Sequence, residues 1–431
     1  MPRLLLLLPS TSYRIDAFLE AAARSGAEVA AACDRQPALA SLRPGDLLAL
    51  DFTDPMAAAK QAAALARERP FDAVLGVDDA TAVVAAAIAA ELSLPRRNPI
   101  EAARVAGNKR LQRESLAAAG LPVPWHRAYP LDGDPARAAA EFPYPCVLKP
   151  LVLAASRGVL RADDPDSFVA AFRRIARILE DSEIARRGAD AREILVESFV
   201  AGREIALEAL LVGGRLHPLA LFDKPDPLEG PTFEETIYVT PSRLAEETQR
   251  AIVDSVSAAA RTMGLREGPV HAECRIASGA PAPAGRATHG GPPGAARGAR
   301  APVILEVAAR SIGGLCSRAI RFVDGGTLED VIVRHALGLP AGSLAREPLA
   351  SGVMMIPIPR GGTLEGVRGK EDARAVPLIE DVAITAHPGQ TLVPLPEGSR
   401  YLGFIFARGE TPDAVEEALR RAHARLEFIV R

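Results

Sequence analysis

Short apolar runs alternate with amphipathic stretches over the first hundred residues. Apolar runs of four to six residues have the length of buried strands, and the stretches between them repeat apolar residues at helical spacing. The expected strands lie at 4–8, 28–32, 47–50 and 73–77, and the expected helices at 13–25, 55–66 and 79–92. Asp54-Pro55 is a helix start signal, an N-cap before proline at the first helical position. Strands alternating with helices predict a small doubly wound α/β domain.

The pattern changes after about residue 99. Paired Gly213-Gly214 between alternating apolar runs predicts a hairpin turn, and Thr411-Pro412 predicts the start of a closing helix. Further helices are expected at 100–106, 109–119, 164–179 and 242–263, and further strands at 146–150, within 194–222, and at 270–276, 303–307, 353–356 and 401–407. Residues 278–302 contain only Ser, Gly, Ala, Pro, Arg, Thr and His. This composition cannot bury a core, so it predicts a disordered loop inserted into a β-hairpin.

Composition narrows the class of protein. A chain of 431 residues predicts two to four domains. A formal net charge of -3 without a block of basic residues gives no reason to expect nucleic acid. The apolar run 4–8 is too short for a secretion signal, and no segment has the length of a membrane span, so a cytoplasmic protein is expected. The cysteines are scattered and indicate neither a disulfide framework nor a zinc site.

Lysine is rare in this chain. Of 51 basic residues only Lys60, Lys109, Lys149, Lys224 and Lys370 are lysines. A retained lysine suggests a position that needs a compact ammonium on a thin stem. Chance retention is the alternative for any single lysine, and it weakens because three of them fall in the segments discussed next.

Two expected strands offer carboxylates among apolar neighbours. Alternation places His271, Glu273 and Arg275 on one face of the first strand, and Glu306 and Arg310 on one face of the second. Carboxylate oxygens suit Mg²⁺, with Mn²⁺ as an alternative metal. The competing interpretation is a half-exposed face with mixed charges.

Two other segments suit a nucleotide. Lys149 ends an apolar strand ahead of the small-residue loop 154–159, which contains Ser156, Arg157 and Gly158 and suits a polyphosphate. The bend Glu197-Ser198-Phe199-Val200, followed by Glu204, suits an adenine and a ribose. An ordinary loop and a plain strand-turn-strand are the respective alternatives.

Taken together in this order, the segments resemble the ATP-grasp superfamily over essentially the whole chain. Segments 222–242, 306–314 and 401–408 are most similar to the carboxylate–amine ligases related to L-amino-acid ligases (dipeptide synthases). The resemblance implies an α/β and α+β multidomain fold. Its expected parts are an N-terminal pre-ATP-grasp α/β domain (1–105), two ATP-grasp α+β subdomains (106–196 and 197–338) and a small C-terminal α+β domain (339–431).

The resemblance also implies roles for individual residues. Lys109 and Lys149 would bind the ATP phosphates, residues 154–159 would cover them, Glu197 to Val200 would form the adenine hinge, and Glu204 would bind the ribose. Glu273 and Glu306 would hold the metal, and Arg310 would steady an acyl phosphate. His271 is expected to hold substrate or accept the amine proton, with a structural partner of a backbone carbonyl as the alternative. Ala308 stands where the superfamily usually has asparagine.

These roles imply an ATP-dependent enzyme that joins a carboxylate to an amine through an acyl phosphate, releasing ADP and phosphate. Small-molecule acids and amines, amino acids above all, are the expected substrates, and a homodimer is the family expectation. The alternatives are a purine-pathway ligase, a biotin-carboxylase-like component, or a non-catalytic ATP-binding regulator. Ala308 gives the regulator some support, and the retained lysines, glutamates and Arg310 argue against it. An NAD(P)-binding protein is disfavoured because the loop after the first strand lacks G-x-G-x-x-G.

Overall fold

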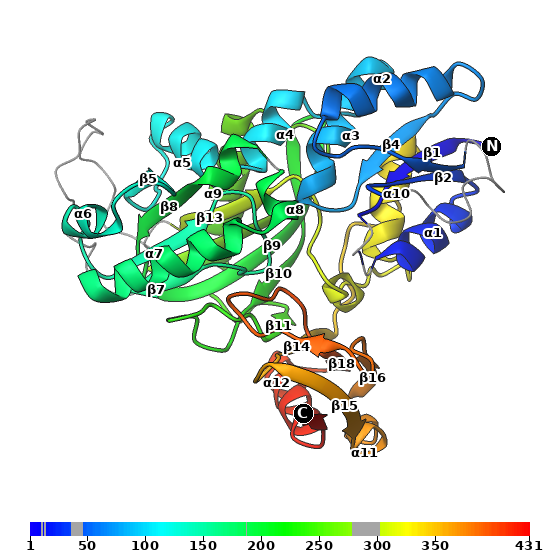
Figure 1. The fold of residues 1–431 in the computed structure, drawn as a ribbon. Coiled ribbons are helices and arrows are strands. Elements are labelled where there is room, and N and C mark those ends of the chain that lie inside the picture. Colours follow the sequence, from blue (N-terminus) through cyan, green and yellow to red (C-terminus); the bar gives the residue numbers. More distant parts are fainter. Residues whose placement is uncertain (10–11, 13, 36–45, 187, 278–301) are drawn as a thin grey trace.

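The computed structural model describes residues 1–9, 12, 14–35, 46–186, 188–277 and 302–431. The chain forms a mixed α/β multidomain structure in which the N-terminal and central parts make the body and a C-terminal lobe projects from it (Figure 1). The α/β and α+β fold class expected from the sequence is confirmed. The expected loop at 278–302 lies, except for its last residue, outside the described residues.

A parallel four-stranded sheet forms the N-terminal part, in the order β3-β2-β1-β4. The strands are β1 (Arg3–Leu7), β2 (Glu28–Cys33), β3 (Leu47–Ala49) and β4 (Ala73–Gly76). Helices α2 (Pro55–Ala66) and α3 (Asp79–Glu91) pack on one face, with Leu5 and Leu7 in the core between them. Helix α1 (Ile15–Arg24) packs on the other face with α10 (Leu328–Leu337), which comes from much later in the chain (Figure 1).

A second four-stranded sheet follows, in the order β5-β8-β6-β7. The strands are β5 (His126–Pro130), β6 (Cys146–Pro150), β7 (Leu160–Ala162) and β8 (Glu193–Ser198). Before this sheet the chain forms α4 (Ile100–Ala106) and α5 (Lys109–Ala118). Between the strands of the sheet, in sequence order, the chain forms α6 (Pro135–Ala140), α7 (Pro165–Leu179) and α8 (Ser182–Ala185). Asp164 caps α7 in a reciprocal bond pair with Ser167, so the expected start of this helix is confirmed.

An eight-stranded antiparallel sheet forms the centre of the molecule, in the order β13-β12-β9-β10-β11-β14-β18-β16. Its strands are β9 (Gly202–Val212), β10 (Arg215–Asp223), β11 (Ile237–Thr240), β12 (Gly268–Ala277), β13 (Val303–Ala308), β14 (Ala350–Ile356), β16 (Ile379–Ile384) and β18 (Gly403–Gly409). The expected hairpin turn at Gly213-Gly214 joins β9 and β10. Three of these strands follow residue 339, so the sheet runs across the domain boundary that we predicted between 338 and 339.

The remaining elements cover the large sheet or complete the C-terminal lobe. Helix α9 (Glu246–Met263) contacts β10 and β13. In the lobe, α11 (Lys370–Arg374) and α12 (Pro412–His423) accompany a small sheet of β15 (Gly362–Arg368), β17 (Thr391–Leu392) and β19 (Glu427–Val430). Thr411 caps α12 as expected.

The prediction of a helix from residue 242 is wrong by four residues, because α9 begins at Glu246. Asp223 binds the Ser242 hydroxyl at 2.6 Å and the Arg243 backbone N–H at 3.1 Å. These bonds hold residues 242 and 243 against the end of β10, so the helix begins later in the sequence, at Glu246.

Candidate active site

A cavity of about 320 Å³ lies where the N-terminal, central and C-terminal parts meet. Asp79 reaches it from α3, Lys149 from β6, Glu273 from β12 and Tyr401 from the segment before β18. Among the residues expected from the sequence to form a site, all except Arg157 and Gly158 line this cavity. The fold therefore collects into one place side chains that are widely separated in the sequence.

Two carboxylates face each other on neighbouring strands. Glu273 of β12 pairs directly with Glu306 of β13, and their side chains are 18% and 21% exposed. Lys109 Nζ lies 3.9 Å from Glu306 and also donates to the Leu153 carbonyl at 2.8 Å. Oxygen donors that are accessible from the cavity and only partly neutralised fit a hard divalent cation.

Lys224 lies at the centre of a carboxylate cluster. Its ammonium is 2.8 Å from Glu204, 2.5 Å from Glu235 and 2.9 Å from Glu273, and its side chain is 3% exposed. Burial alone would lower the pKa of Lys224, but the surrounding carboxylates raise it well above its usual value. Burial raises the pKa of Glu235 to about 7, although Lys224 opposes this shift. The oxygens of the three glutamates lie close enough together to share one cation, and here the shared cation is the Lys224 ammonium.

Lys149 belongs to a buried ion triad. Glu197 contacts Lys149 Nζ at 2.6 Å and Arg113 Nε at 2.7 Å. Burial would raise the pKa of Glu197, but the two cations outweigh it and lower the pKa to about 2. Burial lowers the pKa of Lys149 while Glu197 opposes that shift. The Glu197 carboxylate therefore holds the Lys149 ammonium at the cavity wall.

The expected adenine hinge lies beside a small apolar cluster. Phe199 packs with Val147, Leu228 and Phe233, which provide flat apolar surfaces at this end of the cavity. The Val200 carbonyl accepts a 2.7 Å bond from Arg275, which also donates to Glu204 at 2.9 Å. The backbone of Ser198 is tied to Trp125, because the Ser198 N–H donates to the Trp125 carbonyl at 2.8 Å. Glu204 thus reaches the cavity with cationic partners on both oxygens, and its contact with a ribose stays a prediction.

The expected phosphate loop is turned partly away from the cavity. Gly158 N–H donates to the Pro396 carbonyl at 2.9 Å, and Arg157 Nε donates to the Glu397 carbonyl at 2.8 Å. Gly158 has φ +72°, and a Cβ there would lie 2.8 Å from the Pro150 ring, so this close approach requires glycine. Ser156 faces the cavity. Ala154, Ala155 and Val159 also line the cavity, and the contact that we expected between the loop and a terminal phosphate stays a prediction.

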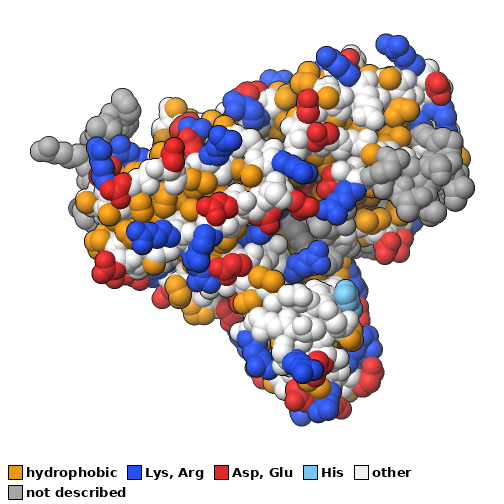
Figure 2. All heavy atoms as spheres, viewed as in Figure 1, with side chains coloured by type: hydrophobic (Ala, Val, Ile, Leu, Met, Phe, Trp, Pro, Cys, Tyr) orange, Lys and Arg blue, Asp and Glu red, His pale blue; other side chains and the backbone are white. Residues whose placement is uncertain are grey.

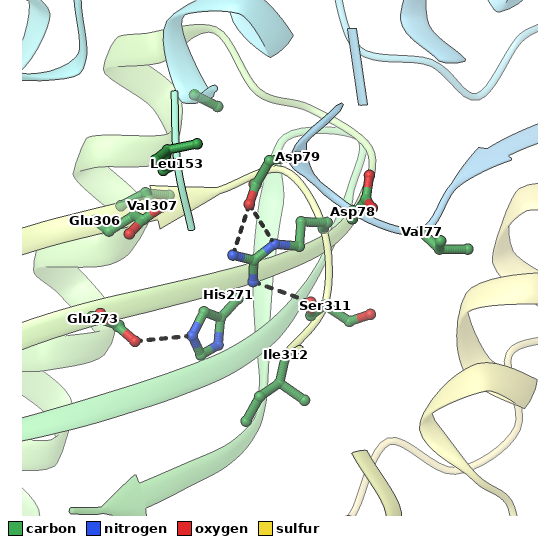
Figure 3. A network of polar contacts seen from close by, with 12 residues as sticks. Val77, Asp78, Asp79, Leu153, His271, Glu273, Glu306, Val307, Ser311 and Ile312 are labelled. Carbon is green, nitrogen blue, oxygen red and sulfur yellow. Dashed lines mark hydrogen bonds and ion pairs between the residues drawn. The ribbon is translucent and has the colours of Figure 1, made fainter. Parts of the chain in front are cut away.

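His271 is held between two carboxylates, whereas the sequence had offered a backbone carbonyl as its alternative partner. Its Nδ1 contacts Glu208. Its Nε2 lies 3.4 Å from Glu273, the contact that is dashed in Figure 3. Burial would lower the pKa of His271, but Glu208 outweighs it and raises the pKa to about 9. Glu208 also accepts the Ile312 N–H at 3.1 Å. The raised pKa favours the protonated form of the imidazole, and the roles expected for His271, holding substrate or accepting the amine proton, stay predictions.

Arg310 is paired with a carboxylate of the N-terminal domain. Its Nε and Nη2 donate to Asp79 at 3.1 and 2.9 Å, and its Nη1 donates to the Ser311 carbonyl at 3.3 Å. The bonds that end on Asp79 and on Ser311 are dashed in Figure 3. Burial would lower the pKa of Arg310, but Asp79 outweighs it and raises the pKa. Asp79 lies at the start of α3, next to the N-cap Asp78. This pair fixes the direction of the guanidinium group at the cavity.

The asparagine that the superfamily usually carries is replaced by an alanine that is fully buried. Ala308 has 0% exposure and lies opposite His271 in the strand pair. We expect Ala308→Asn to lower the free energy of unfolding by about 1–3 kcal/mol, because a larger polar side chain must enter filled space. Thermal melting would measure this loss. A variant with unchanged melting and a lower Mg²⁺ requirement would instead mean that the new amide reaches the metal.

Several cavity residues were not expected from the sequence as site residues. Arg14, buried at 5% exposure, donates to the Ser311 hydroxyl at 2.6 Å and to the Val77 carbonyl at 3.0 Å. Asp79 and Glu235 add carboxylates to the lining of the cavity, and Glu208 contacts the lining residue His271. Lys224 had one signal, since it is among the few retained lysines. The others had none, because their partners are distant in the sequence.

The outer surface and the helices add two observations. On the face drawn in Figure 2, basic and acidic side chains are interspersed over the body and the C-terminal lobe. Among the described residues, no helix combines the length and the apolar character needed to cross a membrane.

Comparison with known families identifies three regions of the chain. Residues 19–96 match the ATP-grasp N-terminal domain, residues 142–282 match the ATP-grasp domain, and residues 354–431 match the L-amino acid ligase C-terminal domain 2. The last match covers most of the segment in which we predicted a separate C-terminal domain.

Individual proteins are similar to this chain over all or part of its length. The crystal structure of L-amino acid ligase from Bacillus licheniformis superposes with a TM-score of 0.79 at 25% identity, covering 100% of this chain and 99% of that one. The uncharacterized protein y4rH of Sinorhizobium fredii is 26% identical over 78% of this chain and 63% of its own length. Alanine–anticapsin ligase of Bacillus subtilis is 27% identical over 41% of this chain. The matched regions span 63% of y4rH and 39% of alanine–anticapsin ligase, so this chain corresponds to part of each.

Proposed function

We propose that this chain, which carries an ATP-grasp domain and is homologous to L-amino acid ligases, is an ATP-dependent carboxylate–amine ligase. It would join two amino-acid substrates by an amide bond through an acyl phosphate and release ADP and phosphate. The proposal rests on the observation that one cavity is lined by all of these residues: Lys109, Lys149, Glu273, Glu306 and Arg310. Because the reaction consumes ATP, the cytoplasmic location expected from the sequence suits it.

Phosphoryl transfer to a carboxylate needs charge neutralisation and alignment. A carboxylate oxygen attacks the γ-phosphorus, the bond to the bridging oxygen of ADP breaks, and an acyl phosphate forms. Lys109 and Lys149 provide two ammonium groups for the phosphate oxygens, and Lys149 is held in place by Glu197. The apolar cluster around Phe199 would receive the adenine ring.

Glu273 and Glu306 are the residues that would hold Mg²⁺. When bound, the ion would neutralise phosphate charge and polarise the transferred group. The fit rests on the directly opposed carboxylates, both accessible from the cavity. Arg310, fixed by Asp79, would steady the oxygens of the acyl phosphate.

The amine would then attack the acyl carbon, the C–O bond to the phosphate would break with its electron pair on the phosphate oxygen, and the departing phosphate would accept the proton that the nitrogen loses. His271 lines the cavity with its Nε2 3.4 Å from Glu273, and it would hold an oxygen of the substrate or of the departing phosphate. Glu208 keeps the ring in that orientation.

We expect purified protein to release ADP and phosphate from Mg-ATP only when a suitable pair of amino acids is present. A panel of amino-acid pairs, with bicarbonate as an alternative acid, would identify the substrates. Phosphorus NMR of the turnover mixture should show phosphate and ADP, because the lysines and carboxylates are arranged for transfer of the γ-phosphate. Pyrophosphate and AMP as products would contradict the mechanism, and turnover with bicarbonate alone would contradict the substrate class.

A further inference from the structure

Strand β13, which carries Glu306, lies at the edge of the eight-stranded sheet. Within the part of the chain that the structure describes, only one side of β13 pairs with another strand, β12. The backbone groups on the other side of an edge strand need partners, because a buried unpaired N–H or C=O is costly. Val307, the residue after Glu306, is fully buried, so its outward backbone groups cannot rely on water.

A side chain of helix α5 supplies those partners. Val307 N–H donates to Gln112 Oε1 at 2.9 Å, and Gln112 Nε2 donates to the Val307 carbonyl at 3.0 Å. Gln112 is 1% exposed and also donates to the Ala106 carbonyl at 3.3 Å. The amide group thus gives Val307 both bonds that a neighbouring strand residue would give.

The next residue of α5 extends the same attachment. Arg113 is completely buried and donates to the Leu305 carbonyl as well as binding Glu197. Helical spacing places Gln112 one turn after Lys109, whose ammonium lies near Glu306. One helix therefore contacts strand β13 on both sides of Glu306 and also reaches the carboxylate itself.

The connection between β12 and β13 is long, since residues 278–302 separate the two strands in the sequence. A connection of this length does not set register as a two-residue hairpin loop does. The pair also contains a register shift between Glu273 and Cys274. A slip of one residue would turn Glu306 to the opposite face of the sheet.

We propose that Gln112 is a positioning residue that locks the register of β13 through the backbone of Val307 and so keeps Glu306 opposite Glu273. The lock itself is a property of the protein without ligands. Its consequence for metal binding rests on the proposed function, because it assumes that the two glutamates share a cation.

The test uses two substitutions and one matched control. Gln112→Met keeps the length of the side chain and removes both bonds to Val307. Gln112→Glu keeps an acceptor for the Val307 N–H and loses the donor to its carbonyl. Glu114→Gln, at an exposed position of the same helix, is the control. Melting curves would establish that each variant is folded.

The first measurement is amide hydrogen exchange without nucleotide or metal. In Gln112→Met we expect the Val307 N–H to exchange about tenfold faster or more, because local opening no longer breaks a side-chain bond. Gln112→Glu should retain most of the protection, and Glu114→Gln all of it. Unchanged exchange at Val307 in a folded Gln112→Met would overturn the lock, whether or not the protein is a ligase. If Gln112→Met does not fold, Gln112→Glu decides, because it lacks one of the two bonds to Val307. Exchange at Val307 faster than in Glu114→Gln supports the lock, and exchange equal to that of Glu114→Gln overturns it.

The second measurement is the metal requirement. We expect the Mg²⁺ concentration for half-maximal ADP release to rise about tenfold in Gln112→Met, as for other groups that orient metal ligands, with kcat at saturating Mg²⁺ close to that of the unaltered protein. A role in stability alone would lower the melting temperature and leave the Mg²⁺ midpoint in place, and that result would overturn the positioning role. If the unaltered protein turns over no ATP, the affinity for Mn²⁺ in the presence of ADP, measured by electron paramagnetic resonance, decides the same question.

Discussion

Arg310→Ala is expected to lower kcat by about 10²- to 10³-fold, the loss seen when one preorganised donor to a developing charge is removed. The affinity for ATP should change little, because Lys109 and Lys149 remain to bind the phosphates. The reason is that Arg310 is held by Asp79 in a fixed direction at the cavity, so its contribution appears when charge moves to the transferred group. Single-turnover kinetics together with ATP titration would separate the two effects.

The substitution also has a structural consequence that needs its own control. Removing Arg310 leaves Asp79, whose side chain is 27% exposed, without its cation, and the loss of stability should stay below the roughly 3–5 kcal/mol of a fully buried pair. The double variant Arg310→Ala with Asp79→Asn removes both charges and should regain much of that stability without regaining turnover. Arg137→Ala, whose side chain is 83% exposed on α6, controls for the loss of one arginine. Turnover restored in the double variant would show that Arg310 acts through stability and not at the reacting group.

Much of the fold was predictable from local patterns. The buried runs at 4–8 and 73–77 are strands because each offers consecutive apolar side chains to both faces of a parallel sheet, and residues 3–7 are all buried. Start signals such as Asp54-Pro55 and Asp164-Pro165 held because an N-cap bond depends only on neighbouring residues. The alternation in β12 and β13 placed Glu273 and Glu306 on a common face for the same local reason.

The unpredicted features depend on contacts between distant segments. Helix α10 packs on the N-terminal sheet although it follows that sheet by some 250 residues, and the central sheet continues across the boundary that we expected near residue 338. Strand β15 was missed because its residues are mostly half-buried or exposed and include glycine and charged side chains. No local pattern contains such information, since propensity describes only the segment itself.

The same distinction applies to the candidate site. Residue types and spacing identified side chains that reach the cavity, and for Glu273 and Glu306 the reason is that they lie on strands with clear alternation. Spacing could not show that Arg310 would pair with Asp79, which is 231 positions earlier, or that the Gly158 N–H would be taken by Pro396. The partners that set the direction and pKa of each group come from the tertiary structure.

Lys149→Ala is expected to weaken ATP binding and lower turnover strongly. A hydrogen bond to a charged group contributes about 1.5–3 kcal/mol, so the loss of one phosphate contact corresponds to roughly 10- to 150-fold in kcat/KM for ATP.

In the same Lys149→Ala variant, Glu197 would keep Arg113 as its only cation of the triad. Its pKa, now about 2, would therefore rise. A carboxyl with a lowered folded-state pKa stabilises the protein above its ordinary pKa of 4.5, and this stabilisation is lost as the pH falls toward 2. The variant should thus gain less stability between pH 2 and pH 4.5 than the unaltered protein does.

Lys370→Ala is the matched control, because Lys370 begins α11 in the C-terminal lobe, outside the residues that line the cavity. It removes the same side chain and should change neither ATP affinity nor the dependence of stability on pH. Isothermal titration with ATP and acid denaturation of both variants would measure the two effects independently. Equal ATP affinity in the two variants would place the phosphates away from β6. A normal acid profile in Lys149→Ala would mean that Arg113 alone keeps Glu197 ionised, and that the lysine is held at the cavity without contributing to the stability of the fold.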